Sequence, residues 1–205
     1  MTHSQPGKIK QSPKLPAEQR RRQLLAAARN LFMKNGYEET TTEQIARKAG
    51  LTKGALYFHF KNKEEILFDL VREMNQESIS AVQSIPHGKA NPVCLLRALL
   101  AANPEATTAD VSNYLDFWAQ ASKIPRIRRY IRNCHDDFHR AIDNRIDRGF
   151  APTRRDRHDL AVMILAMHDG LAVRKMLGHK DVDFSRQLKL FAAMIRGKMD
   201  NTLRN

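Results

Sequence analysis

The sequence predicts an all-α protein of about nine helices, in which a three-helix helix-turn-helix domain precedes a larger helical bundle. Residues 41–63 (TTEQIARKAGLTKGALYFHFKNK) contain the caps and the glycine of two short helices joined by a tight turn. After Asn62, apolar residues recur with helical spacing, and no alternating strand pattern appears. Apolar residues make up 42% of the chain, which is enough to form a core.

We divide the 205 residues into three parts. Residues 1–17 hold lysines and prolines without the apolar segment of a signal peptide, so we expect a disordered basic arm. Residues 18–62 form the helix-turn-helix domain, and residues 63–205 form the second domain. No run approaches the roughly 20 apolar residues that cross a bilayer. Cys94 and Cys134 have no metal or redox spacing, which is typical of a protein in the reducing cytoplasm.

The first expected helix has one apolar face and ends at Gly36. Its apolar side chains recur as they do in a supporting helix: Leu24, Leu25, Ala28, Leu31 and Phe32. Gly36 follows Lys34 and Asn35, as a C-terminal glycine does. We therefore expect this helix to support the two shorter helices that follow it.

The first short helix begins at Thr41 or Thr42, where a threonine side chain can cap free backbone N–H groups. Glu43 or Gln44 lies within reach of a capping box. Gly50 stands where the turn needs a left-handed residue. The apolar residues of this helix share one face: Ile45, Ala46 and Ala49.

The second short helix is capped by Thr52 and anchored by Leu51 and Leu56. Phe58 and Phe60 are expected to add apolar bulk before the next helix. The remaining side chains form a basic, hydroxyl-rich outward face, which suits phosphates and base edges in a major groove. With their neighbours they give the candidate DNA-binding residues: Thr41, Thr42, Thr52, Lys53, Gly54, Ala55, Tyr57, His59 and Lys63.

Within this set we expect a division of roles. The residues expected to touch mainly phosphates are Lys53, Tyr57, His59 and Lys63, along with Thr42 at a helix N-terminus. Gly54 and Ala55 lie against base edges, where a thymine methyl fits. An ordinary helical hairpin with a solvated basic face is the alternative, because short helix-turn-helix patterns also arise by chance.

The distribution of charge favours a polyanionic partner. The chain has a net charge of +13. Residues 1–63 hold 13 Lys or Arg against 4 Asp or Glu, whereas residues 64–205 hold 22 against 18. The excess therefore lies with the helix-turn-helix, and it predicts salt-dependent binding to DNA. An anionic membrane would also attract it, but the basic residues lack the broad opposing apolar face of an interfacial helix.

Residues 20–67 (RRRQLLAAARNLFMKNGYEETTTEQIARKAGLTKGALYFHFKNKEEIL) resemble the DNA-binding domain of the TetR/AcrR family of transcriptional regulators. The resemblance covers about residues 18–70 and rests on Phe32, Gly36, the AGLTKGALYFHF block and KNKEEIL. It implies that the first three helices bind DNA as one half of a homodimer. It also implies that the remaining helices bind a small effector and hold the dimer together.

The chain beyond Asn62 is expected to be helical throughout. Apolar stripes are separated by breaks at Pro86–Pro92, at Asn103-Pro104 and at Pro125. Gly149 is expected to end the long basic helix. The helices predicted before it are residues 63–85, 93–102, 108–123 and 125–148.

The last two helices, about 154–177 and 184–203, are predicted to form the interface of a homodimer. The first is apolar on two sides, as in a helix that lies between its own core and a partner subunit. Pairing with symmetry mates would give a twofold four-helix contact, although an intrachain core helix would show the same pattern. The candidate interface residues are Leu160, Ile164, Leu171, Leu188, Phe191, Ile195 and Met199. Residues 114–150 and MHDGLAVRKMLG are also similar to the C-terminal domain of BetI-like TetR proteins.

The interior of the second domain is predicted to bind an apolar or amphipathic small molecule. Clustered aromatics and flexible methionines suit such a pocket, and aromatic faces can hold a quaternary ammonium. Plain core packing is the alternative. The candidate effector-binding residues are Leu70, Met74, Leu99, Tyr114, Phe117, Trp118, Phe138, His139, Met163 and Met167.

No catalytic set, cofactor site or metal site is expected. There is no glycine-rich phosphate loop and no serine elbow. His135 and His139 stand four apart on a helix, but no third metal ligand is evident beside them. The sequence thus predicts a cytoplasmic, ligand-responsive regulator that binds a near-palindromic operator as a homodimer, most simply a repressor. The alternatives are a DNA-binding structural or adaptor protein without an effector and, more distantly, an enzyme.

Overall fold

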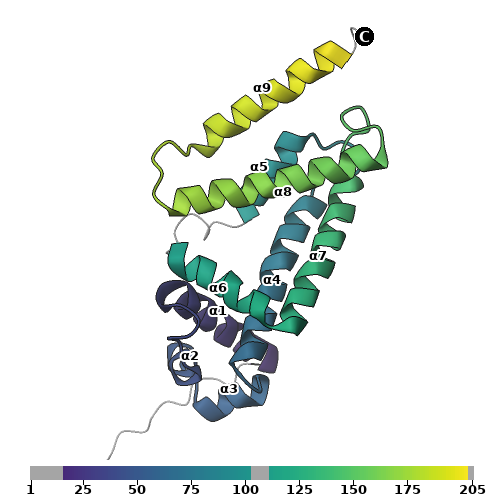
Figure 1. The fold of residues 1–205 in the computed structure, drawn as a ribbon. Coiled ribbons are helices and arrows are strands. Elements are labelled where there is room, and N and C mark those ends of the chain that lie inside the picture. The colour runs from purple at the N-terminus through teal and green to yellow at the C-terminus, as the bar shows by residue number, and fades with distance from the viewer. Residues whose placement is uncertain (1–15, 103–110, 203–205) are drawn as a thin grey trace, which may run out of the picture.

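The computed structural model describes residues 16–102 and 111–202, and the helices in these ranges confirm the all-α prediction. Figure 1 shows α1, α2 and α3 at one end of the molecule and α8 and α9 at the other. Between the two ends, α4 and α7 run side by side. The predicted arm at 1–17 lies almost wholly outside the described residues, and α1 begins at Ala17.

The first three helices are α1 (Ala17–Asn35), α2 (Thr42–Lys48) and α3 (Lys53–His59). Both short helices have the predicted side-chain caps. Thr41 accepts the Gln44 N–H at 3.2 Å while the Gln44 side chain accepts the Thr41 N–H at 2.7 Å, and Thr52 accepts the Ala55 N–H at 3.2 Å. Gly50 turns the chain between them with a φ of 67°, which glycine adopts without a steric penalty.

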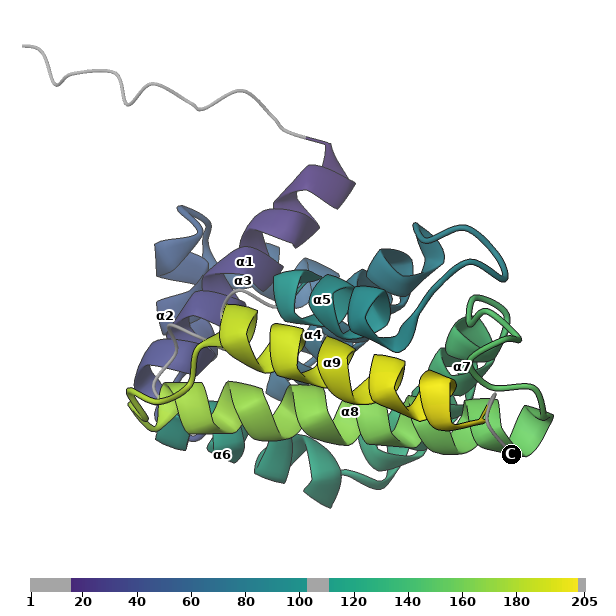
Figure 2. The same cartoon turned by 90° about the horizontal axis from the view of Figure 1, so that it is seen from above.

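Six longer helices follow. They are α4 (Lys63–Gln83), α5 (Pro92–Ala102), α6 (Val111–Lys123), α7 (Pro125–Asp143), α8 (Arg154–Met176) and α9 (Phe184–Thr202). In the view from above, α5 lies beside α9 and α8 passes below them (Figure 2). No helix among the described residues is both long and apolar enough to cross a membrane.

The buried apolar residues form two clusters. The head cluster joins α1–α3 to the first half of α4 and to α6 and the start of α7, and it includes Phe32, Leu56, Leu70 and Phe117. The distal cluster joins the end of α4 to α5, α7, α8 and α9. The three-helix end therefore does not have a core of its own, because α4 and α6 complete it.

The end of α7 differs from the prediction. The helix stops at Asp143 rather than near residue 148, because Ile146 pairs with Ala90 in an isolated bridge. Arg145, buried at 8% exposure, donates to the carbonyl of Ala141 at 3.2 Å and to that of Gln83 at 3.1 Å. One guanidinium thus caps the last turns of both α7 and α4. Its positive charge also interacts favourably with the negative ends of the two helix dipoles.

Candidate functional site

The helix-turn-helix is held by a small apolar contact between its two short helices. Ile45, Ala46 and Leu56 are buried, as the sequence predicts. Phe60 is buried as well, but Phe58 is 81% exposed. Of the two rings expected to supply apolar bulk before the next helix, only that of Phe60, the C-cap of α3, packs into the core, whereas Phe58 lies on the outward side of the helix.

The outward face of α3 brings together most of the predicted DNA-binding residues. Lys53, Gly54 and Tyr57 are exposed, and Ala55 and His59 are half-buried. The Tyr57 hydroxyl lies 3.2 Å from the Thr42 hydroxyl of α2, so the two helices present their hydroxyl groups at one place.

Lys53 is not free on this surface. Its ammonium pairs with the Glu43 carboxylate, and it lies 5.8 Å from the centre of the Tyr57 ring. This hydrogen-bonded pair raises the pKa of Lys53 and lowers that of Glu43. A phosphate that binds Lys53 would compete with Glu43 for the ammonium, and the sequence alone does not reveal this competitor.

Gly54 has no structural need to be glycine. A methyl group at this position would meet only the Thr52 hydroxyl, at an ordinary contact distance of 3.9 Å, and the backbone there is not left-handed. Glycine costs about 1 kcal/mol against alanine inside a helix. Its presence on an exposed surface is therefore consistent with the predicted close approach of a base edge.

Lys63 is placed differently from its prediction. Its ammonium donates to the carbonyls of Tyr37 at 2.9 Å and Glu38 at 3.3 Å, and it lies 4.2 Å from the centre of the Tyr37 ring. With 24% of its side chain exposed, Lys63 holds the α1–α2 turn against the start of α4. The Lys63 ammonium is thus engaged within the protein and is less available to a phosphate than that of an exposed lysine.

Helix α6 also forms hydrogen bonds with the turn between α1 and α2. The Asp116 carboxylate accepts the Tyr37 N–H at 3.1 Å, and the Asn113 amide donates to the Lys34 carbonyl at 2.8 Å. Both contacts join α6 to the end of α1. Any displacement of α6 would therefore act directly on the helix that supports the helix-turn-helix.

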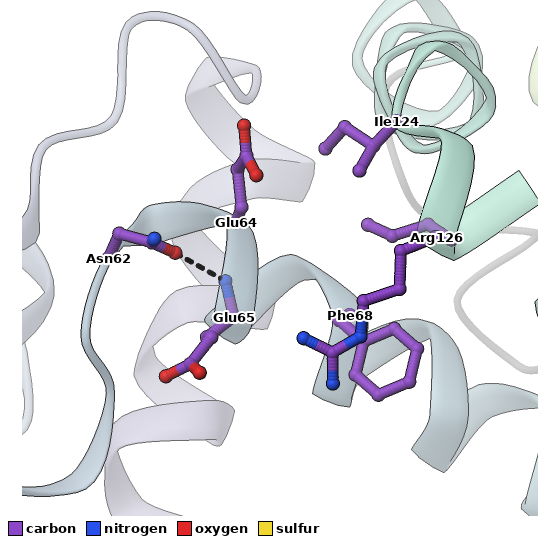
Figure 3. Close-up of a pocket in the computed structure, with 7 residues that line it drawn as sticks. Asn62, Glu64, Glu65, Phe68, Ile124 and Arg126 are labelled. Atoms are coloured by element: carbon purple, nitrogen blue, oxygen red, sulfur yellow. Dashed lines mark hydrogen bonds between the residues drawn. The ribbon is translucent and has the colours of Figure 1, made fainter.

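A second contact between the two parts of the molecule lies where the start of α4 meets the turn between α6 and α7. It encloses a cavity of about 130 Å³ that is lined by Asn62, Glu64, Glu65, Phe68, Ile124, Arg126 and Ile127. Figure 3 shows the Arg126 guanidinium beside the Phe68 ring, and the distance from its central carbon to the ring centre is 4.1 Å. This cation–π contact connects α7 to the base of α4.

The predicted effector-binding residues do not form a single group. Leu70, Met74, Tyr114, Phe117 and Trp118 belong to the head cluster, and Leu99, Phe138 and Met167 belong to the distal cluster. His139 faces His158 of α8 with 4.6 Å between ring centres, and Met163 is 59% exposed. The Trp118 indole N–H is buried, and no acceptor for it exists in the described part of the chain.

The predicted dimer residues mostly face the interior. Ile164 and Phe191 are buried in the distal cluster, and Leu160, Leu188 and Ile195 pack against it. Leu171 is half-buried, and the side chain of Met199 lies outside the described residues. The apolar side chains that these helices leave exposed are others, with exposures of 45–67%: Val162, Met163, Leu177, Leu190 and Met194.

The histidines of α7 do not form a metal centre. Burial, together with the neighbouring His158 and His135, lowers the pKa of His139. Within residues 16–102 and 111–202, no three His, Cys, Asp or Glu side chains are grouped so that they could hold a metal ion.

Comparison with known proteins agrees with this architecture. Residues 24–70 match the family model of the bacterial regulatory proteins of the tetR family, and residues 94–199 match that of the BetI-type transcriptional repressor C-terminal domain. The transcriptional regulator TtgR of Pseudomonas putida is 32% identical over 180 residues, which are 82% of this chain and 85% of that protein. BetI of Escherichia coli is 27% identical over 187 residues, 83% of this chain and 90% of that protein.

A solved structure has the same fold. A transcriptional regulator from Saccharomonospora viridis, determined in complex with choline, superposes with a TM-score of 0.66. It is 21% identical, and the match covers 87% of this chain and 96% of that one. The family matches and the TtgR relative together show that this chain is a transcriptional regulator of the TetR family with a BetI-type C-terminal domain.

Proposed function

We propose that the chain is a cytoplasmic repressor that binds a near-palindromic operator as a homodimer and releases it when a small molecule binds. Membership of the family makes the enzyme alternative untenable. The observation that carries the proposal is the exposed face of α3, which presents Lys53, Gly54 and Tyr57 together, with the Thr42 hydroxyl of α2 lying 3.2 Å from that of Tyr57. Such a surface suits phosphates around a base edge.

The exposed Phe58 ring extends this proposed surface. An aromatic ring that is 81% exposed beside Tyr57 and His59 is suited to apolar contact with a thymine methyl. Each subunit would read one half of the operator, with half-site centres one helical turn apart, roughly 34–36 Å, or a multiple of it.

Substitutions of Lys53 and Glu43 should change DNA affinity in opposite directions. Lys53→Ala should weaken binding to operator and random DNA alike and flatten the slope of log affinity against log salt by about 0.9 per subunit. Glu43→Gln should strengthen both, because it removes the competitor of the phosphate. Fluorescence anisotropy at several salt concentrations measures both effects. If Lys53→Ala changed sequence preference at an unchanged slope, Lys53 would read bases instead.

The proposed homodimer forms through the exposed apolar faces of α8 and α9. Val162 and Met163 on α8, with Leu190 and Met194 on α9, are each 45–67% exposed in the single chain. Ala166 and Gly170 continue the face of α8, and small residues there let a second helix approach closely. A twofold contact would cover this surface on both subunits at once.

The proposed effector lies against Trp118. Buried N–H groups almost always have an acceptor, and the Trp118 indole N–H has none among the described residues, which supports a ligand that brings one. Tyr114 and Phe117 lie with ring centres 6.3 Å and 5.5 Å from that of Trp118 and supply aromatic surface. The choline in the Saccharomonospora viridis regulator is a quaternary ammonium, which such surfaces can hold. An apolar or amphipathic molecule, cationic in its simplest form, is the proposed effector.

The proposed route from effector to DNA runs through α6. Trp118 is on the helix whose Asp116 and Asn113 bind the end of α1. A ligand that displaces α6 would favour an arrangement in which the two DNA heads no longer match the operator. Linkage requires that operator DNA weaken effector binding by the same factor.

Trp118 is the only tryptophan, so its fluorescence should report the effector directly. We expect tetraphenylphosphonium or choline to quench it and to release operator DNA over the same concentration range. Trp118→Leu should retain operator binding and lose the release. Leu115→Ala, which removes an exposed side chain of the same helix, is the control. If Trp118→Leu responded like the unmodified chain, the pocket would lie elsewhere.

The adaptor without an effector is the second candidate, and it is favoured by the burial of most predicted effector-binding residues within the two apolar clusters. A broad panel of small molecules that left operator affinity unchanged would support this candidate over the ligand-responsive one.

A further inference from the structure

A groove between α5 and α9 presents two cationic side chains beside an apolar floor. It has a volume of about 280 Å³ and is lined by Val93, Arg97, Ser185, Leu188, Lys189 and Ala192. On each helix the lining residues are three or four positions apart, so they share one face. Figure 2 shows the two helices side by side.

The polarity of the groove changes from its floor to its rim. Val93, Leu188 and Ala192 are half-buried, whereas Arg97 and Lys189 are exposed. The stems of the two cationic residues add further methylene surface while their charged groups stay in water. This arrangement suits a molecule with an apolar body and one charged end.

The charge at the rim is uncompensated. Neither Arg97 nor Lys189 has a carboxylate partner in the described part of the chain, and α5 and residues 184–195 of α9 contain no Asp or Glu. The preceding carboxylate, Asp183, is engaged in capping α9, where it accepts the N–H groups of Ser185 at 2.9 Å and Arg186 at 3.2 Å. Within the described residues, both charged groups are therefore open to an anion from solution.

Neither DNA nor the dimer contact accounts for this surface. The groove lies at the end of the molecule opposite α3 (Figure 1). Leu190 and Met194, the exposed apolar residues of α9, are on the face of the helix opposite Leu188 and Ala192 by helical spacing, and Lys189 lies on the flank between the two faces. The groove and the proposed dimer contact can thus be occupied together.

We propose that this groove binds a small amphipathic anion, an alkyl monocarboxylate, whose carboxylate lies between Arg97 and Lys189 and whose alkyl chain covers Val93, Leu188 and Ala192. The volume is near the low end for small-molecule sites, which fits a short chain. The bound anion bridges α5 and α9, so it fixes α9 against the bundle. This site is separate from the aromatic surface around Trp118.

Calorimetric titration of the full chain with decanoate, below its micelle-forming concentration, tests the site. We expect one decanoate per chain and no binding of decyltrimethylammonium at this groove. The double variant Arg97→Gln/Lys189→Gln should weaken decanoate binding about tenfold, because charge-assisted hydrogen bonds are lost. Arg186→Gln removes a positive charge from the same helix outside the groove, and it should bind decanoate like the unmodified chain.

Filling the groove gives an independent test. Ala192→Phe should abolish decanoate binding while helix content and operator binding stay unchanged. The proposal is overturned if the double variant binds decanoate normally or if Trp118→Leu abolishes binding, since the anion would then lie in the interior. Dissociation of a dimer by decanoate would also overturn it, because the groove would then be an interface between copies.

Discussion

The double substitution Met163→Glu/Met194→Glu should convert the proposed homodimer into monomers and lower operator affinity by about 100-fold or more. The two side chains are 59% and 67% exposed, so the variant should fold. In a twofold contact it would place four carboxylates in one apolar interface, where unpaired charges are costly. A monomer would bind one half-site only. It would therefore lose the increase in affinity, about 100- to 10,000-fold, that comes from linking two binding sites.

Sedimentation velocity and operator titration measure the two effects on the same samples. Leu115→Glu is the matched control, because it places a carboxylate at an apolar residue that is 47% exposed on α6, away from α8 and α9. If the double variant remained a dimer at micromolar concentration, the interface would lie on another surface. An unmodified chain that sediments as a monomer would reject the homodimer itself.

Among single substitutions of buried polar or charged residues, removal of Arg145 should give the largest loss of stability. Arg145→Ala would leave two helix-end carbonyls without donors and create a cavity beside the distal cluster. Each unsatisfied buried group costs about 1–3 kcal/mol, so we expect a loss of about 3 kcal/mol in the free energy of unfolding. For a chain of this size that corresponds to a fall of roughly 6–12 °C in Tm.

Circular dichroism melts at one fixed protein concentration measure this effect. Arg145→Met separates packing from hydrogen bonding, because it keeps most of the bulk without the donors. Arg148→Ala removes an exposed arginine from the same segment, and it should change the free energy of unfolding by less than about 0.5 kcal/mol. Equal melting of Arg145→Ala and the unmodified chain would show that water replaces the guanidinium at both carbonyls.

The helices could be predicted because their signals are local. Thr41, Thr52 and Gly50 act on backbone groups within a few residues, and a proline or glycine ends most of the longer apolar stripes. The end of α7 could not be predicted, because it depends on contacts of Ile146 and Arg145 with residues far away in the chain. Local periodicity contains no information about such pairings.

The site was predicted less completely for the same reason. Periodicity showed that α8 is apolar on more than one side, but not which side meets its own chain. The pattern therefore does not distinguish Ile164, which is buried in the distal cluster, from residues that remain open to a partner. Charge alone likewise suggested a phosphate contact for Lys63 and did not reveal that Glu43 holds Lys53. Each of these assignments depends on a partner from another helix.

The pairing of Lys53 with Glu43 bears on how quickly an operator is found. A bacterial regulator meets roughly a million or more competing stretches of DNA before its own site. When a phosphate dissociates from Lys53, the Lys53–Glu43 ion pair forms again. Contacts with random DNA sequence should therefore be brief, and the protein should dissociate from such DNA sooner. At the proposed operator, contacts from the rest of α3 would add to that of Lys53 and keep Glu43 away from it. The ion pair would thus shorten the search rather than strengthen the final complex.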